Sequence, residues 1–571
     1  MANVAESIIE TLAVAGVERI YGVAGDSLNA LTEAIRKEPR LKWVPTRHEE
    51  AAAFAAGAEA HLTGSLAVCA GSCGPGHLHL MNGLYDCQRS GVPVLAIAAH
   101  IPSSEIGSGY FQETHPAALF QECSHYCELV STSRQMPHVL RAALHHAQFK
   151  KGVAVLILPG DVALEETRAP AAAALKTPKP LVRPSDKELD ALAELLNGHE
   201  KITLLGGRGC AGAHDELMAL AQALQSPVVH ALGGKEYIEY DNPYDVGMTG
   251  LIGFASGYHA MASCEALLML GTDFPYRQFY PPRARIAQID IRPEHLGKRA
   301  PLAMGLVGDI RATLSALLPR IRPKAPGRFL DAARKHYQEA RKGLDDLARP
   351  SPGQPIHPQH LTKCVDEAAE YNAIFACDVG TPTVWAARYL KMNGKRRLLG
   401  SFAHGSMANA LSQALGAQSC EPHRQVIALC GDGGLAMLMG ELLSVLQLEL
   451  PIKIVVYNNQ SLGFVALEQK AAGYLDTGVE LKNPNFAEVA QAIGIKGFRV
   501  DDPKGVSSAL EEALAHPGAA LVDVAINPQE LILPPRIGLA EARGFGLFML
   551  KAVLNGRGDE VVEILQSHLF R

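Results

Sequence analysis

The chain repeats one rhythm of hydrophobic and polar positions: a short apolar run, a glycine within the next two residues, and then apolar residues at helical spacing. Such runs occupy residues 66–69, 202–205 and 426–430. Short continuous apolar runs are typical of strands buried in parallel sheets, and helical periodicity between them is typical of crossover helices. The pattern predicts an α/β protein whose sheets are mostly parallel and flanked by helices.

Two proline-rich stretches divide the chain into three units. They run from Arg168 to Pro184 and from Pro319 to Pro358, the second around a charged helical segment. Such composition is typical of linkers between compact domains. We expect three α/β domains and a C-terminal tail, at residues 1–167, 185–325, 350–530 and 531–571.

Composition narrows the class of protein. The 571 residues are 48% hydrophobic and 20% charged, values that exclude a disordered or fibrous chain. A formal net charge of −6 offers no basic surface for nucleic acid, so we expect no such partner. The N-terminus has no basic region and no apolar run approaches the ~18 residues of a membrane span, which predicts a cytoplasmic chain.

The strongest chemical pattern lies in the third unit. The apolar run 426–430 enters Gly431-Asp432-Gly433-Gly434, and a helical stretch is expected over 435–448. A second apolar run, 452–457, ends in Asn458-Asn459. One crossover brings both loops to the same edge of a parallel sheet. Asp432 and Asn459 then offer the oxygen ligands that Mg²⁺ prefers, and the glycines let backbone N–H groups approach a diphosphate. The alternative is an ordinary turn in which these residues cap a helix.

This Gly-Asp-Gly…Asn-Asn pattern resembles the signature of thiamine-diphosphate enzymes. The resemblance covers essentially the whole chain, and segments 67–76, 109–115 and 378–385 are similar to quinone-reducing pyruvate dehydrogenases of the pyruvate oxidase–acetolactate synthase superfamily. It implies that Asp432 and Asn459 hold Mg²⁺. It also implies a lining for the cofactor's diphosphate formed by Gly433, Gly434, Gln460, Ser461, Leu462, Gly463, Phe464 and Val465.

The resemblance assigns further residues to the reacting end of the cofactor. Glu49, which precedes an alanine-rich helix at 51–60, would hydrogen-bond the aminopyrimidine ring; from the residues alone, a carboxylate that merely stabilises a helix N-terminus fits equally well. Phe111 and Gln112 would approach the reactive carbon, and Phe464 would be a mobile aromatic residue between thiamine and flavin. The bend of the cofactor would rest on Gly405, Ser406 and Met407.

The middle unit contains a Gly-x-Gly-x-x-Gly match at 207–212. The dinucleotide fingerprint also requires an acidic residue about 20 positions further on, and residues 228–233 contain none, so we reject an NAD site. The resemblance implies FAD in this domain instead. Its expected contacts are Gly250, Leu251, Ile252, Gly253, Asp273, Phe274, Pro275, Tyr276, Arg277, Asp290 and Ile291.

The C-terminal tail has an apolar stripe at helical spacing. Val561, Ile564, Leu565 and Leu569 fall at i, i+3, i+4 and i+8. By pattern alone, this predicts a terminal helix packed on its own domain or on a neighbouring subunit. The resemblance implies a second role, as a lipid-triggered anchor that brings the enzyme to the inner face of the cell membrane.

The resemblance implies an oxidative decarboxylase. It would convert pyruvate to acetate and CO₂ with thiamine diphosphate, Mg²⁺ and FAD, and pass electrons to a membrane quinone. The resemblance implies a homotetramer whose thiamine sites lie between subunits. One alternative is a carboligase of the acetolactate synthase type with a structural FAD, and another is a non-catalytic regulator that binds thiamine diphosphate or a membrane.

Overall fold

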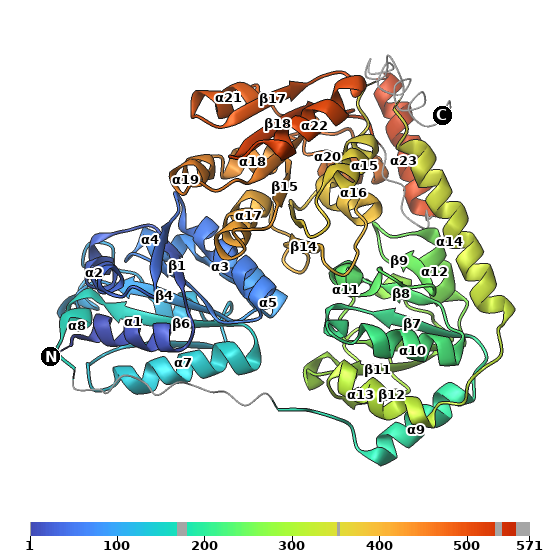
Figure 1. The fold of residues 1–571 in the computed structure, drawn as a ribbon, viewed down its shortest axis with the longest axis horizontal. Coiled ribbons are helices and arrows are strands. Elements are labelled where there is room, and N and C mark those ends of the chain that lie inside the picture. The colour runs from blue at the N-terminus through green and yellow to red at the C-terminus, as the bar shows by residue number, and fades with distance from the viewer. Residues whose placement is uncertain (1, 168–179, 351–354, 531–538, 555–571) are drawn as a thin grey trace.

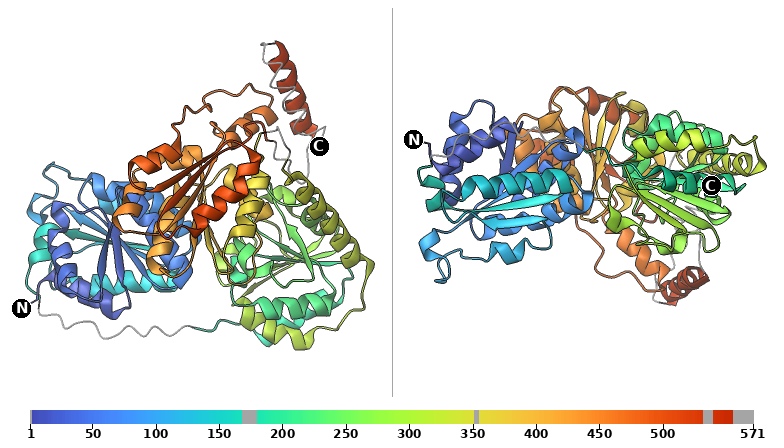
Figure 2. Two further views of the ribbon diagram at one scale, coloured as in Figure 1. Left: turned by 45° about the horizontal axis from the view of Figure 1, so that its top comes forward. Right: turned by 90° about the horizontal axis from the view of Figure 1, so that it is seen from below.

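The computed structural model describes residues 2–167, 180–350, 355–530 and 539–554, which form three domains and a C-terminal helix. Each domain contains one six-stranded sheet in which every strand pairing is parallel, with helices packed on it (Figure 1). The third domain lies between the first and the middle domain (Figures 1 and 2). The predicted class, three α/β domains with parallel sheets, is confirmed.

The first domain has the strand order β2-β1-β3-β4-β6-β5. Its first helix begins at a capping box, in which Asn3 and Glu6 each accept a hydrogen bond from the other's backbone N–H. The strands are β1 (Arg19–Gly22), β2 (Lys42–Pro45), β3 (Ala67–Gly71), β4 (Val94–His100), β5 (Tyr126–Leu129) and β6 (Val153–Pro159). The helices are α1 (Val4–Val14), α2 (Asn29–Lys37), α3 (Glu49–Thr63), α4 (Pro75–His79), α5 (Met81–Ser90), α6 (Pro116–Leu119), α7 (Met136–Lys150) and α8 (Gly160–Leu164).

The middle domain has a different order, β12-β11-β10-β7-β8-β9. Counted from its own first strand this is 6-5-4-1-2-3, the order typical of dinucleotide-binding sheets. The strands are β7 (Ile202–Gly206), β8 (Val228–His230), β9 (Asp245–Met248), β10 (Ala266–Leu270), β11 (Arg285–Asp290) and β12 (Met304–Val307). The helices are α9 (Asp186–Asn197), α10 (His214–Leu224), α11 (Lys235–Ile238), α12 (Ala255–Ala262), α13 (Ile310–Leu317) and the long connecting α14 (Arg328–Leu347).

The third domain returns to the order of the first, β14-β13-β15-β16-β18-β17. Its strands are β13 (Ile374–Cys377), β14 (Arg397–Gly400), β15 (Val426–Gly431), β16 (Lys453–Asn458), β17 (Lys496–Val500) and β18 (Ala520–Ala525). Its helices are α15 (Pro358–Ala368), α16 (Thr381–Tyr389), α17 (Asn409–Cys420), α18 (Asp432–Met437), α19 (Glu441–Gln447), α20 (Gly463–Ala471), α21 (Phe486–Ala492) and α22 (Val506–Ala515).

The first and third domains share one hydrophobic core. It includes the buried alanines of α3 and α17, which pack directly against each other. Gly416 makes this possible, because a Cβ at that position would lie 2.1 Å from the backbone oxygen of Ala55. The two domains therefore meet backbone to backbone, with no room for a side chain at this crossing.

A buried carboxylate joins all three domains at a second place. The carboxylate of Glu236, from the middle domain, lies 3.0 Å from His61 Nε2 of the first domain and accepts a 2.8 Å hydrogen bond from Arg397 Nε of the third. Burial alone would raise the pKa of Glu236, but the hydrogen bond and charge of His61, followed by Arg397, lower it below its usual range. Glu236 therefore stays ionised and holds the junction together.

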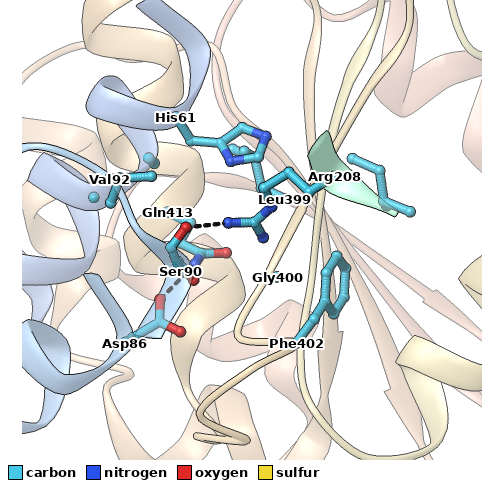
Figure 3. Close-up of a pocket in the computed structure, with 12 residues that line it drawn as sticks. His61, Asp86, Ser90, Val92, Arg208, Leu399, Gly400, Phe402 and Gln413 are labelled. Carbon is cyan, nitrogen blue, oxygen red and sulfur yellow. Dashed lines mark hydrogen bonds between the residues drawn. The ribbon is translucent and has the colours of Figure 1, made fainter. Parts of the chain in front are cut away.

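A small pocket lies beside this junction (Figure 3). Arg208 of the middle domain donates a hydrogen bond to the backbone oxygen of Ser90 of the first domain. Asp86, also of the first domain, accepts hydrogen bonds from Ser401 Oγ at 2.8 Å and from Gln413 Nε2 at 3.4 Å, both in the third domain. Polar side chains thus form hydrogen bonds across the domain boundaries beside this pocket.

The last described helix, α23 (Leu539–Leu554), packs against α20. Phe548 and Ala552 are fully buried, and Lys551 Nζ donates to the backbone oxygen of Gly473 at 2.8 Å. The helix also exposes Leu547, Leu550, Val553 and Leu554. None of the described helices is both long and apolar enough to span a membrane. The predicted stripe from Val561 to Leu569 lies outside the described residues.

Candidate functional site

Asp432 occupies the turn between β15 and α18, at the edge of the third sheet. It is 2% exposed, and its carboxylate accepts hydrogen bonds from Gly433 N at 2.9 Å and Asn483 Nδ2 at 2.8 Å. Burial raises its pKa to about 6. A buried carboxylate whose charge is poorly compensated is stabilised by a nearby cation, and carboxylate oxygens are suitable ligands for Mg²⁺.

Asn459 follows β16, the strand that pairs with β15, so the two predicted metal ligands lie at the same edge of the sheet. Asn459 Oδ1 accepts a hydrogen bond from Ser461 N at 3.2 Å, which folds the next residues into a tight loop. Gln460 in that loop has a φ of +54°, a conformation that non-glycine residues adopt at some energetic cost and that concentrates at functional sites. Asn483 bridges the two loops, because it also donates to Asn458 Oδ1 at 3.1 Å.

The glycines of the turn are closely surrounded. A Cβ at Gly433 would lie 2.9 Å from Leu462 and 3.4 Å from Met407. Leu462 belongs to the predicted lining of the diphosphate and Met407 to the predicted support of the cofactor's bend, so both predicted sets lie next to Gly433. A Cβ at Gly434 would lie 2.2 Å from the carboxylate of Asp378. The turn therefore has no space for a side chain at Gly434.

Glu49 begins helix α3 in the first domain. It is 7% exposed, and its Oε2 lies 2.9 Å from His79 Nδ1. His48, Glu49 and His79 form the one group of three metal-ligand side chains within the described residues, but the imidazole rings stack 4.4 Å apart. Stacked rings do not direct their nitrogens at a common ion, so we interpret this group as a buried carboxylate paired with an imidazole, which can hold or transfer a proton.

Gln112 lies close to the same end of the first domain. Its φ is +63°, its Oε1 accepts a hydrogen bond from Cys73 Sγ at 3.2 Å, and a Cβ at Gly74 would lie 2.8 Å from Gln112 Cβ. The same turn approaches Glu49, since a Cβ at Gly76 would lie 3.2 Å from Glu49 Oε1. Phe111 points outward and is 79% exposed in the single chain.

The predicted flavin residues lie beyond the carboxyl ends of β9, β10 and β11, at one edge of the middle sheet. Gly250 has a φ of +102°, and a Cβ there would lie 3.0 Å from the ring of Phe274. The neighbouring Thr249 hydroxyl is buried and has no hydrogen-bond partner among the described residues. Arg388, from the third domain, donates to the backbone oxygen of Ile252 at 3.0 Å and fixes this turn.

The remaining predicted flavin residues differ in exposure and in whether their side chains are already hydrogen-bonded. Asp273 is already paired with Arg299, whose Nε lies 2.6 Å away, and Asp290 accepts a hydrogen bond from Arg292 N. Tyr276 and Ile291 are exposed. The sequence-predicted residues that complete this edge are Leu251, Gly253, Pro275 and Arg277.

The predicted residues therefore gather in three places. One is around Asp432 in the third domain, one around Glu49 and Gln112 in the first, and one at the edge of the middle sheet. A hydrogen bond between the domains connects the first two of these places indirectly: Ser406 Oγ of the third domain accepts it from Asn82 Nδ2 of the first. Within the described chain, the hydrogen bond of the Glu49 carboxylate goes to His79 and none joins it to Asp432. Phe464 and Val465 lie in the first turn of helix α20 (Gly463–Ala471), just past the loop of Asn459.

Several residues around these places were not predicted. Asn483 lies 51 residues beyond Asp432 in a segment without regular structure, and nothing in the sequence marks it. Asp378 carries a hint, since it follows an apolar run, as Asp432 does, and a glycine, Gly380, lies two positions further on. Asp378 accepts hydrogen bonds from Ala410 N and Gly431 N, and burial raises its pKa to about 7.

Comparison with known proteins agrees with this arrangement. Family models for thiamine pyrophosphate enzymes match the N-terminal TPP binding domain at residues 2–119, the central domain at 189–317 and the C-terminal TPP binding domain at 378–524. Three α/β domains with an acidic Gly-Asp-Gly turn thus define a thiamine pyrophosphate-dependent enzyme.

Relatives along the chain make the family more specific. An uncharacterized 42.6 kDa protein of Pseudomonas amyloderamosa is 66% identical over 61% of this chain and 89% of its own. The putative thiamine pyrophosphate-containing protein YdaP of Bacillus subtilis is 37% identical over 98% of each chain. Pyruvate oxidase of Lactiplantibacillus plantarum is 30% identical over 91% of this chain and 88% of its own. The chain belongs to the thiamine pyrophosphate-dependent family that includes pyruvate oxidase and acetolactate synthase.

Proposed function

We propose that the protein oxidatively decarboxylates pyruvate: pyruvate, water and a quinone give acetate, CO₂ and the quinol. The observation that carries the proposal is the buried Asp432–Asn459 edge, with its glycine turn, in a chain related along nine-tenths of its length to a pyruvate oxidase. Thiamine diphosphate supplies an electron sink for loss of CO₂ from a 2-oxo acid, and FAD accepts the two electrons.

The residues of the third domain fit thiamine diphosphate and Mg²⁺. Asp432 and Asn459 would hold the cation with their side-chain oxygens. The pKa of Asp432 is raised because its buried charge is poorly compensated, and a bound cation would stabilise that charge. Gly433 and Gly434 would line the diphosphate at the start of α18. Met407 would support the cofactor's bend from the side, as an apolar contact.

The residues of the middle domain fit FAD. The buried hydroxyl of Thr249 has no hydrogen-bond partner among the described residues, and the neighbouring Gly250 has a positive φ. Together they form a turn whose hydroxyl could hydrogen-bond a ligand. The strand order of the sheet favours a nucleotide at this edge. Phe274 would supply an apolar wall, and Arg388 would hold this turn from the neighbouring domain.

Glu49 would move the proton that starts the reaction, at its carboxylate. His79 holds that carboxylate on one oxygen, and burial separates it from bulk water. Because the described chain has no contact between Glu49 and Asp432, we propose that each site combines Glu49 of one subunit with Asp432 of another in a homotetramer. Phe111 and Gln112 would then face the substrate, and Phe464 would lie between the two cofactors.

We further propose that the protein works at the inner face of the cell membrane, held there by its C-terminal tail, residues 531–571. The exposed leucines of α23 favour an apolar surface as the partner of this region. Removal of residues 559–571 should abolish binding to phospholipid vesicles and leave flavin reduction by pyruvate unchanged. Vesicle binding by the truncated protein would contradict this part of the proposal.

Anaerobic addition of pyruvate to the flavin-loaded protein tests the reaction. Bleaching of the flavin with formation of acetate would support oxidative decarboxylation. Acetolactate with an unbleached flavin would indicate the carboligase alternative, and absence of turnover would exclude both. Glu49→Gln should slow flavin reduction by a factor of about 10²–10⁴, because a positioned proton-transfer group contributes that much, while leaving binding of Mg²⁺ to the third domain intact.

A further inference from the structure

The loop that carries Phe111 and Gln112 is organised by one carboxylate. Residues 106–115 form no regular strand or helix, and they connect the end of β4 to α6. Glu113 accepts hydrogen bonds from Gly107 N, from Gly109 N at 2.7 Å and from Tyr110 N at 3.2 Å. Three backbone donors therefore converge on a side chain that follows directly after the two predicted substrate-facing residues.

The backbone of the loop is shaped for this carboxylate. Gly107 and Gly109 have φ values of +92° and +76°, in the left-handed region that turns their N–H groups inward. The Glu113 backbone N–H closes the turn by donating to Tyr110 O at 2.9 Å. These hydrogen bonds, with the one from Gly107 first, lower the pKa of Glu113, so the carboxylate is ionised and accepts all three donors at neutral pH.

The C-terminal end of the loop is fixed independently of Glu113. Thr114 Oγ1 lies 2.6 Å from His77 Nε2, and His77 Nδ1 lies 2.9 Å from the backbone oxygen of Ala99 in β4. Gln112 is held by Cys73 at 3.2 Å. In the centre of the loop, Glu113 holds Gly107, Gly109 and Tyr110, while Ser108 is hydrogen-bonded to Glu105.

We propose that Glu113 is a positioning residue that holds residues 107–112 in the shape that presents Phe111 and Gln112 to the 2-oxo acid. The assignment rests on the proposed function for what the loop contacts. It goes beyond that function by placing substrate recognition under the control of a carboxylate that does not itself contact the substrate. Charge-assisted hydrogen bonds to backbone N–H groups are strong enough for this role.

The test compares Glu113→Gln with Glu105→Gln. Glu105 lies in the same loop region, but among the residues that the structure describes its carboxylate accepts a hydrogen bond only from Ser108 Oγ, at 3.3 Å. Both substitutions remove one charge and keep the size of the side chain. Glutamine at 113 offers one acceptor oxygen and turns an amide group toward the N–H donors. A third variant, Glu113→Asp, keeps the charge on a shorter side chain.

Two measurements decide the outcome. Hydrogen exchange of peptides within 103–114 should be about tenfold faster in Glu113→Gln than in wild type, with Glu113→Asp between them and Glu105→Gln unchanged. In the holoenzyme, the KM for pyruvate should rise about tenfold in Glu113→Gln, while thiamine diphosphate affinity and the thermal midpoint stay at wild-type values. A loss of general structure would instead move the midpoint and the cofactor affinity.

Equal exchange in Glu113→Gln and Glu105→Gln would overturn the proposal, as would faster exchange with an unchanged KM. Failure of the proposed function has a different signature. If the wild-type protein does not reduce its flavin with pyruvate, the proposed reaction is wrong. The exchange measurement on the same protein then still decides whether Glu113 holds the loop.

Discussion

Gly434→Ala should damage the diphosphate turn more than any other glycine substitution in it. A Cβ at Gly434 would lie 2.2 Å from Asp378 Oδ2, and Asp378 is 1% exposed. Asp378 cannot rotate away freely, because its two oxygens accept hydrogen bonds from Ala410 N at 2.9 Å and Gly431 N at 3.2 Å. The added methyl group therefore meets an atom that is held in place on both sides.

The size of the effect follows from these distances. A normal contact between carbon and oxygen needs roughly 3.3 Å, so the carboxyl group must move by about 1 Å. A shift of that size breaks one or both hydrogen bonds to buried N–H groups, at about 1–3 kcal/mol each. We expect a free energy of unfolding that is lower by about 2–4 kcal/mol. Thiamine diphosphate should bind about 10²-fold more weakly, since the displaced turn no longer presents its N–H groups.

The same turn provides graded controls. A Cβ at Gly431 would lie 3.6 Å from Pro382, an ordinary contact, and a Cβ at Gly433 would lie 2.9 Å from a terminal methyl of Leu462, which can move. Urea midpoints and cofactor titration by fluorescence quenching should therefore rank the alanine variants 431, 433 and 434, from mildest to most severe. If Gly434→Ala matches Gly431→Ala in both measurements, the argument from close packing is wrong.

Three further predictions concern the junctions of the domains. Burial raises the pKa of Asp86 to about 6, so the folded chain holds a proton that the unfolded chain has lost between about pH 4 and 6. The free energy of unfolding should therefore fall by up to about 3 kcal/mol as pH rises through that window. Denaturant titrations should show that Asp86→Asn removes this pH dependence. Glu236→Gln leaves Arg397 without its buried counterion and should cost about 3 kcal/mol or more at pH 7, seen as a lower thermal midpoint; an unchanged midpoint would contradict the role of this ion pair. Phe548→Ala should release α23 from α20, at a cost of about 3 kcal/mol, and expose the tail to limited proteolysis while the rest of the chain stays resistant.

The sequence predicted the candidate site best where the order of the strands alone brings the residues together. Asp432 and Asn459 could be placed together because each follows an apolar run, and the pairing of β15 with β16 confirms that their loops are neighbours. The flavin segments at 250–253 and 273–277 also meet, but only the resemblance indicated them. Whether these residues bind their cofactors stays a prediction.

Tertiary contacts explain what the sequence could not predict. A single helix was expected over 435–448, but the structure has two, α18 and α19, separated at residues 438–440. The second helix begins where Glu441 accepts hydrogen bonds from Arg47 N and His48 N of the first domain. Helical periodicity cannot reveal a partner that lies almost 400 residues away. The Gly-x-Gly-x-x-Gly match likewise leads into a short 3₁₀ turn at Arg208–Cys210, and the α-helix begins only at His214.

The shared strand order of the first and third domains has a consequence for how the chemistry is divided. Helices α3 and α17 each connect the second strand of their sheet to the third, and they cross where Gly416 meets Ala55, so the two domains pack through equivalent helices. At equivalent positions the two halves differ: α3 begins with Glu49 and α17 with Asn409, and the third strand runs into Ser72 in one and Asp432 in the other. The first domain thus carries Glu49, the proposed proton-transfer group, and has Ser72 where the third domain has Asp432. The third domain carries Asp432, the proposed cation ligand, and has Asn409 where the first domain has Glu49.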